Sequence, residues 1–182
     1  MCRIFFISLI VIFLITCNNN SDVRYYQLDK VSINANDNKN KIKSDALSFT
    51  APEGWAASNG SSMRLESFNV PFDGGFGDLS VIRLGGNAGG DLANINRWRG
   101  QLNLPAIDKI KMDEITNISK GYSYNYKWFK IINISEPTSA FLCAILPERE
   151  TTIFVKLNIP ISAIKEVEKQ FLEFCSSIIV SK

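Results

Sequence analysis

The sequence contains no histidine. Without an imidazole, the chain cannot form a Ser-His-Asp or Cys-His catalytic set, and it cannot bind a metal ion through histidine. Its four cysteines include no CxxC pair, which argues against a zinc site or a thioredoxin-type redox site. We therefore expect no metal and no cofactor, and the sequence indicates no catalytic residue of these classes.

The sequence also lacks any block of like charge. Its 20 basic and 18 acidic residues give a formal net charge of +2. Proteins that bind nucleic acid usually concentrate Lys and Arg on one face or along one helix. We therefore expect no nucleic-acid partner.

The N-terminal apolar run is too short to cross a bilayer as a helix. It extends over 12 residues from Ile4 to Ile15, whereas a spanning helix needs about 20. It follows Arg3 and ends in the segment LITC, which resembles the lipobox of bacterial lipoproteins. The pattern predicts a signal peptide at residues 1–16 and lipidation of Cys17. An ordinary signal peptide and an uncleaved anchor are the alternatives.

Lipidation of Cys17 would anchor the mature chain in the bacterial cell envelope, because the acyl chains insert into a bilayer. Asn18 rather than Asp follows the cysteine, which favours the outer membrane with the protein facing the periplasm. Residues 17–45 are polar and rich in asparagine, which predicts a flexible tether. We expect a single globular domain over residues 46–182.

Within this domain, hydrophobic periodicity predicts strands and two helices. A strand is expected around Leu47 and Phe49, and the segment between the helices, Ile107 to Ile118, is interpreted as a linker with a short strand. Further strands are expected at 63–70, 78–84, 122–134, 140–146 and 152–159, with helices at 91–102 and from Pro160 to Ile178.

Glycine is concentrated in one part of the chain, since seven of the 11 glycines lie between Gly74 and Gly90. Asp91 follows them as an expected N-cap. In the helix after it, Leu92, Ile95, Trp98 and Leu102 share an apolar face, and Asn94, Arg97 and Gln101 share the opposite one. The polar face is a candidate recognition surface, or else an ordinary solvated face.

Trp98 and Arg99 are expected to be structural anchors of the same helix. Arg99 projects into the apolar sector, so its guanidinium should be paired or should reach solvent.

The order of strand, glycine turn and helix also resembles a phosphate-binding loop. However, Asp91 and Leu92 follow Gly90 where a P-loop has Lys and Ser or Thr, and Asp91 would repel an anion. A phosphate or small-ligand site formed by the turn at 85–90 and the helix at 91–102 is kept as an alternative. A second alternative is an enzyme that uses Asp73, Asp78 and Asp91 for acid–base chemistry.

The predicted strand at 122–134 carries a row of aromatic side chains. Tyr122, Tyr124, Tyr126 and Trp128 share one face by strict alternation. Such a row can form a ligand platform, but it more often lies beneath a helix, as we expect here.

Two cysteines fall within the domain, Cys143 in an expected strand and Cys175 on the apolar face of the last helix. An oxidising envelope would allow a disulfide between them. We favour two buried free thiols, because buried cysteine commonly behaves as a small hydrophobic residue.

Several segments of the domain resemble the PsbP-like family. They are FTAPEGW at 49–55, MRL at 63–65, GDLSV at 77–81, NINRWRGQ at 94–101 and FVKL at 154–157. More narrowly, they resemble an uncharacterised group of bacterial lipoproteins with the motif NxNRWRGQ. The resemblance implies an α+β fold, an α-β-α sandwich with a mostly antiparallel sheet flanked by helices on both faces. Since members of this family mostly act as binding or assembly factors, it also implies a non-catalytic module whose partner is an envelope protein or a small ligand.

Overall fold

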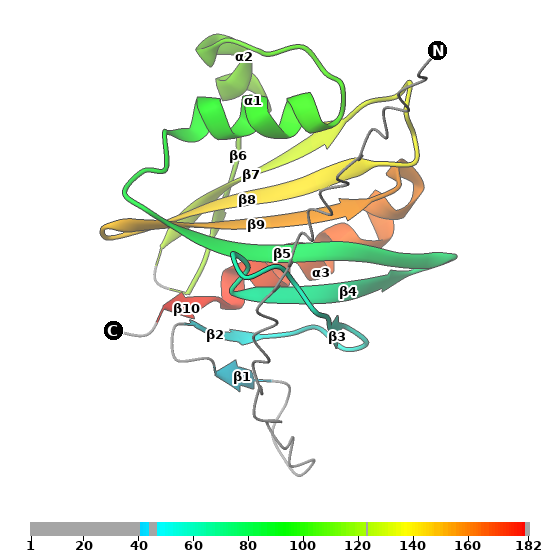
Figure 1. Ribbon diagram of the computed structural model, residues 1–182, viewed down its shortest axis with the longest axis vertical. Helices are drawn as coiled ribbons and strands as arrows, with labels where there is room; N and C mark the ends of the chain where they lie inside the picture. Colours follow the sequence, from blue (N-terminus) through cyan, green and yellow to red (C-terminus); the bar gives the residue numbers. More distant parts are fainter. Residues whose placement is uncertain (1–40, 44–46, 123, 181–182) are drawn as a thin grey trace, which may run out of the picture. The chain divides into compact units, whose positions relative to one another are not determined.

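A seven-stranded sheet organises the chain, in the order β3-β4-β5-β9-β8-β7-β6, and every neighbouring pair is antiparallel (Figure 1). The computed structural model describes residues 41–43, 47–122 and 124–180, all within the unit Asp37–Lys182. The predicted signal peptide and Cys17 lie outside the described residues. The strands are β3 (Ala56–Ala57), β4 (Glu66–Phe72), β5 (Gly75–Gly85), β6 (Asn117–Lys120), β7 (Asn125–Ile132), β8 (Ala140–Glu148) and β9 (Thr151–Ile159).

A smaller sheet lies at the ends of the described chain. It has the order β1-β2-β10, formed by Lys41–Lys43, Leu47–Thr50 and Ile179–Val180. The strand β1 falls inside the segment expected to be a tether, so regular structure begins before residue 46.

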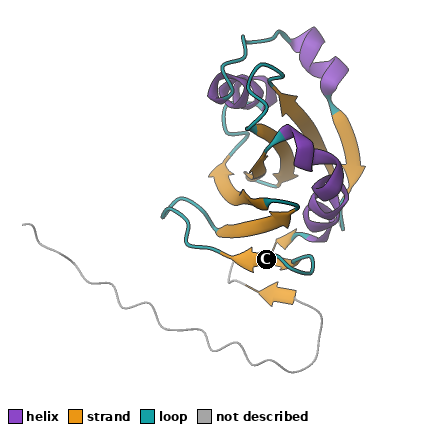
Figure 2. Ribbon diagram, turned by 90° about the vertical axis from the view of Figure 1, so that its right-hand side faces the viewer, coloured by secondary structure: helices purple, strands orange, loops and turns teal. Residues whose placement is uncertain are grey.

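Helices cover both faces of the large sheet, as Figure 2 shows from the side. They are α1 (Asp91–Gln101), α2 (Lys109–Ile115) and α3 (Ile164–Ser177), the last preceded by the 3-10 turn η1 (Ile161–Ala163). None of the described helices is long and apolar enough to span a membrane.

The alternation of side chains along β8 and β9 explains why the sheet needs cover on both faces. In β8, Leu142 and Ala144 belong to the core cluster beneath α3, whereas Cys143 and Ile145 belong to the cluster beneath α1 and α2. In β9, Val155 faces the first cluster in the same way. Strands buried on both faces are continuous apolar runs, which is the pattern of these two segments. The α-β-α sandwich expected from the sequence is therefore confirmed.

The helix α3 buries the apolar face predicted for it, formed by Ile164, Val167, Phe171, Phe174 and Cys175. Beneath it, Phe174 contacts the rings of Phe49, Trp55 and Phe68 with centroids 5.2–5.7 Å apart. This aromatic cluster joins the helix to β2, to the turn after β2 and to β4.

Three expected elements differ from the structure. The segment interpreted as linker and short strand contains the helix α2 before the strand β6, and Asp108 caps this helix by accepting a hydrogen bond from the Lys111 N–H at 2.8 Å. The sequence showed no helical repeat of apolar residues in this segment, because Met112 is the only buried residue of the helix and Ile110 is 72% exposed. The strand expected at 63–70 begins only at Glu66. The strand expected at 122–134 is shorter, since β7 extends from Asn125 to Ile132.

Candidate functional site

The glycine turn between β5 and α1 positions the candidate site. Gly86, Gly89 and Gly90 have positive φ values of 60°, 85° and 88°, which glycine adopts without the steric cost of a Cβ. Gly90 is the N-cap, and no side chain caps the helix. The prediction that Asp91 is the N-cap is therefore wrong: Asp91 is the first helical residue, and its carboxylate pairs with Lys127 instead.

Asn94 does not lie on an exposed face, contrary to the sequence interpretation. Its side chain is only 3% exposed, and its amide donates to the carbonyl oxygens of Ala88 at 3.0 Å and Gly90 at 2.8 Å. The Gly90 carbonyl also accepts from the Asn94 backbone N–H at 3.3 Å, so Asn94 bonds to the glycine turn through both its backbone and its side chain. The buried side of α1 therefore includes Asn94 as well as Ile95 and Trp98. A recognition surface cannot include the Asn94 side chain.

Arg97 and Gln101 are exposed, as expected from the sequence. The Arg97 guanidinium donates to the Asn94 side-chain oxygen at 2.5 Å. Gln101 accepts a hydrogen bond of 2.8 Å from the ammonium group of Lys156, whose Nζ lies 4.5 Å from the centroid of the Phe141 ring. Burial lowers the pKa of Lys156. The Arg97 and Gln101 side chains are therefore exposed, but each already has a hydrogen-bond partner within the protein.

Trp98 and Arg99 hold α1 in place. The indole of Trp98 is 7% exposed and meets the ring of Phe154 edge to face, with centroids 6.0 Å apart. Arg99 is half-buried and donates from Nε to the Pro105 carbonyl oxygen at 2.9 Å. The partner predicted for Arg99 is thus a backbone carbonyl. This hydrogen bond holds the segment after the helix against the helix.

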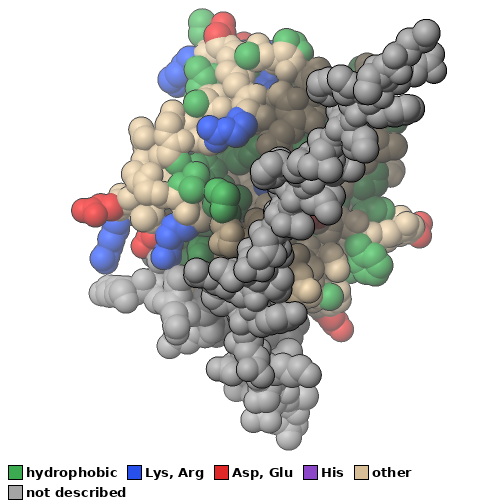
Figure 3. Space-filling model, viewed as in Figure 1, with side chains coloured by type: hydrophobic (Ala, Val, Ile, Leu, Met, Phe, Trp, Pro, Cys, Tyr) green, Lys and Arg blue, Asp and Glu red, His purple; other side chains and the backbone are tan. Residues whose placement is uncertain are grey.

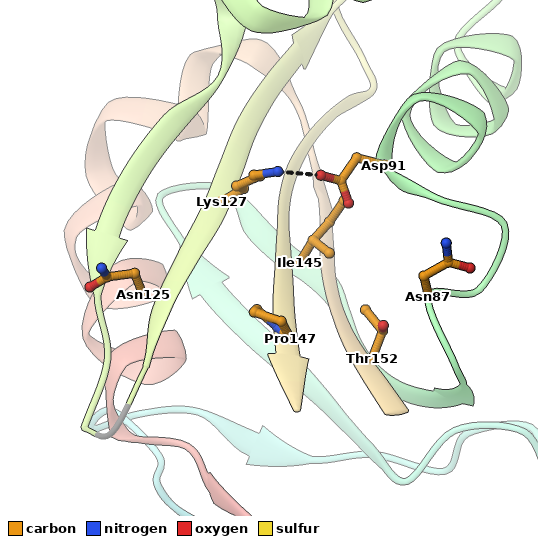
Figure 4. A pocket seen from close by; sticks show the side chains of 7 residues that line it. All are labelled: Asn87, Asp91, Asn125, Lys127, Ile145, Pro147 and Thr152. Atoms are coloured by element: carbon orange, nitrogen blue, oxygen red, sulfur yellow. Dashed lines mark hydrogen bonds and ion pairs between the residues drawn. The ribbon is translucent and has the colours of Figure 1, made fainter. Parts of the chain in front are cut away.

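A small pocket of about 170 Å³ lies on the sheet beside the start of α1 (Figure 4). Register explains how it forms: Lys127 of β7 is opposite Ile145 of β8, and Pro147 of β8 is opposite Thr152 of β9. Directly opposite residues share a face of an antiparallel pair. These side chains therefore continue the surface beneath α1 past the point where the helix begins.

The polar walls of the pocket come from the glycine turn, from the first helical residue and from β7. Asp91 and Lys127 form an ion pair with an N–O distance of 2.5 Å, and their side chains are 27% and 46% exposed. Asn87 lines the pocket from the turn, and Asn125 lines it from the start of β7. The Thr152 hydroxyl donates to the Gly86 carbonyl at 2.8 Å, which holds the turn against β9.

The sequence interpretation did not select Lys127, Ile145, Pro147 or Thr152. A usable signal was present, because the alternation that places the aromatic row on one face of the strand places Lys127 on the other. The pairing of Lys127 with Asp91 spans 36 positions in the sequence and had no local signal.

The three aspartates proposed for acid–base chemistry do not converge. Arg64 binds the Asp78 carboxylate through two hydrogen bonds of 2.7 and 2.8 Å, and these bonds lower the pKa of Asp78. Asp91 pairs with Lys127, and Asp73 lies in the exposed turn between β4 and β5. Among the described residues, no group of three or more Cys, Asp or Glu side chains is placed to hold a metal ion.

The aromatic row lies beneath α3, as expected, except at its first residue. The hydroxyl of Tyr124 donates to the carbonyls of Cys175 and Ile178, and that of Tyr126 donates to the carbonyl of Leu172. Trp128 is also buried against this face. Tyr122 is 74% exposed and is the accessible member of the row.

Cys143 and Cys175 are buried free thiols that belong to different core clusters on opposite faces of the sheet. Burial raises the pKa of both thiols well above the ordinary value. Both groups therefore act as apolar core residues.

The surface that carries α1 has mixed charge. Figure 3 shows Lys or Arg and Asp or Glu side chains close together among the coloured residues of this view, without a broad area of one sign. Ion pairs such as Arg83 with Glu148 at 3.8 Å contribute to this mixture.

No protein-family model matches the chain, and no curated protein matches it. Among solved structures, a crystal structure at 1.50 Å resolution from Bacteroides thetaiotaomicron VPI-5482 is 14% identical, with a TM-score of 0.50. The match covers 75% of this chain and 45% of that one, so this chain spans less than half of that protein. The solution structure of cyanobacterial PsbP (CyanoP) from Synechocystis sp. PCC 6803 is 16% identical, with a TM-score of 0.48 and coverage of 75% and 88%. The first likeness concerns the fold alone, and the second is too distant to carry an argument.

Proposed function

We propose that this protein is an envelope lipoprotein, anchored through acyl chains on Cys17, whose sandwich domain is a non-catalytic binding or assembly module. The partner is an envelope protein or a small ligand. The exposed side of α1, at Arg97 and Gln101, is the proposed surface for a protein partner.

The dispersion of the candidate carboxylates is the observation that carries the binding role. Acid–base catalysis by paired carboxylates needs two of them around one substrate, with at least one pKa adjusted toward the working pH. Here Asp78 is bound by Arg64 and its pKa is lowered, while Asp91 is bound by Lys127 on another part of the sheet. This arrangement favours binding over acid–base catalysis.

The anchor is tested by Cys17→Ser. We expect the variant to lose palmitate incorporation and to move from the membrane fraction to the soluble fraction, because a cysteine thiol is required for lipidation. Cys143→Ser is the matched control, since its thiol lies in the core and should not affect labelling. Persistent palmitate on Cys17→Ser would contradict the proposed anchor.

The binding role is tested by crosslinking the wild-type protein in intact envelopes and identifying the captured molecule. We expect one reproducible partner, captured by the wild-type protein and lost when Arg97 or Gln101 is replaced. Turnover of a substrate by the purified domain, abolished by Asp78→Asn or Asp91→Asn, would contradict the non-catalytic role.

A further inference from the structure

The pocket beside the start of α1 combines an apolar floor with polar walls. Ile145 and Pro147 form the floor, while the ion pair of Asp91 and Lys127 lies along one side (Figure 4). Its volume of about 170 Å³ is below the range of roughly 300–1,000 Å³ usual for drug-sized ligands. The pocket can therefore hold one small ring or a chain of a few atoms.

The charges of the pocket cancel. Asp91 contributes one negative charge and Lys127 one positive charge, and the two groups are bound to each other. An anion would gain from Lys127 but would meet the Asp91 carboxylate, and a cation would meet the opposite problem. Either ion would be repelled by one member of the pair, whereas a neutral ligand would be repelled by neither.

Hydrogen-bonding groups of both kinds remain available in the pocket. The Asp91 oxygen that does not bind Lys127 is directed toward Ile145, and it accepts no hydrogen bond from the described residues. Lys127 carries three N–H donors, of which one bonds to Asp91. Asn87 uses its side-chain oxygen to accept from the Gly89 N–H, so its amide donors are left for a ligand within the described part of the chain.

An acceptor and a donor that lie side by side match a pair of adjacent hydroxyl groups. A hydroxyl both donates and accepts, so one hydroxyl can donate to Asp91 while its neighbour accepts from Lys127. The C–H face of a ring that carries such hydroxyls would lie on Ile145 and Pro147, where apolar contact is favourable.

We propose that this pocket binds one ring of a neutral saccharide. The proposal rests on the binding role given above and names the ligand class of one site. Because one ring makes few contacts and the floor has no aromatic side chain, millimolar affinity is expected for a monosaccharide.

The test is an amide NMR titration of the full-length lipidated protein in a detergent without a sugar or phosphate headgroup. The neutral probes are methyl glucoside, methyl galactoside and N-acetylglucosamine, and the charged probes are inorganic phosphate, an anion, and methylammonium, a cation. We expect at least one neutral probe to cause saturable shifts at the amides of Gly89, Asp91 and Lys127. The charged probes should leave these amides unchanged.

Two variants locate the site. Pro147→Trp places a large ring over the floor and should abolish the saccharide shifts. Asn69→Trp introduces the same ring at an exposed strand position of β4, three strands away from β8 in the sheet order, and should preserve them. Asp91→Asn should weaken saccharide binding tenfold or more and should allow phosphate to bind, because Lys127 loses its counter-ion.

Several results would overturn the proposal. They are the absence of saturable shifts with all three saccharides, saturation by phosphate in the wild-type protein, and unchanged saccharide binding by Pro147→Trp. None of them would affect palmitate labelling of Cys17 or capture of a protein partner through Arg97 and Gln101. Failure of this site can therefore be distinguished from failure of the proposed function.

Discussion

The two faces of the sheet differ in how they are stabilised. The face beneath α3 is closed by apolar and aromatic side chains, and Tyr124 and Tyr126 direct their hydroxyls to carbonyls of the helix and of the residue after it. The face beneath α1 and α2 has a smaller apolar cluster, and polar contacts continue from it. Among these are the buried amide of Asn94 and the ion pair of Asp91 with Lys127.

This difference indicates a division of roles between the faces. Close apolar packing stabilises a fold but offers little to a ligand, whereas sites that bind usually combine apolar surface with a few placed polar groups. The α1 face has that combination at the glycine turn, where the strands of the sheet extend past the start of the helix and leave part of their surface uncovered. We expect substitutions beneath α3 to affect mainly stability, and those around α1 to separate stability from binding.

The largest expected effect is the loss of Phe174 beneath α3. Phe174→Ala should lower the free energy of unfolding by about 3–5 kcal/mol, because it removes a fully buried ring that contacts three other rings. Trp98→Ala on the other face should cost about 3 kcal/mol, near the low end, because the indole keeps some exposure. Urea denaturation measures both.

Phe76→Ala is the control for these two variants. Its ring is 70% exposed, so the change should stay within about 0.5 kcal/mol. If Trp98→Ala unfolds like the wild-type protein, the α1 cluster contributes little to stability and the proposed contrast between the faces is larger than described.

A smaller effect is expected from the buried amide of Asn94. Asn94→Ala should cost about 1–3 kcal/mol, since the Ala88 carbonyl loses the amide donor and the Gly90 carbonyl keeps only its bond from the backbone N–H of residue 94. Thermal or urea unfolding measures the loss, with the exposed Asn69→Ala as the matched control. A neutral Asn94→Ala would indicate that water replaces the amide and that the turn does not depend on it.

The sequence predicted the fold more completely than the site. Alternation located β8 and β9, and helical periodicity identified the buried side of α3, because these elements repeat one simple pattern over many residues. The helix α2 was missed because it has a single buried residue, Met112. Asn94 was misassigned because its partners are backbone carbonyls of a turn whose conformation is not encoded in a periodic pattern. Lys127 was missed because its partner comes from a distant element.

The ion pair of Arg64 with Asp78 should contribute a modest and pH-dependent stability. The pKa of Asp78 is lowered in the folded state below the ordinary value of 3.8, chiefly by the hydrogen bonds from Arg64. The unfolded chain therefore binds more protons in this range, so the contribution is present above the unfolded pKa and is lost as pH falls through the folded pKa.

Comparing wild type with Asp78→Asn at pH 7 and at pH 3 tests this. We expect a difference of about 0.2–1 kcal/mol at pH 7, discounted because the Asp78 side chain is 51% exposed, and a smaller difference at pH 3. In an Arg64→Ala background the pH dependence of the difference should largely disappear. An equal difference at both pH values would show that the carboxylate charge is not the cause.

The smallest expected effect on stability belongs to the exposed side of α1, where the largest effect on partner binding is expected. Arg97→Ala and Gln101→Ala should each change the free energy of unfolding by about 0.5 kcal/mol or less, because both side chains are exposed. Arg97 gives up one hydrogen bond to Asn94, and Gln101 gives up one from Lys156, but water can replace each of them. Both variants should nevertheless lose the crosslinked partner.

Arg99→Ala is the contrasting variant: it should lower stability through its lost bond to Pro105 and its lost stem packing, while retaining capture of the partner. If Arg97→Ala and Gln101→Ala keep full capture, the protein-binding surface lies elsewhere. Tyr122 is then the next candidate, because it is the exposed member of the aromatic row.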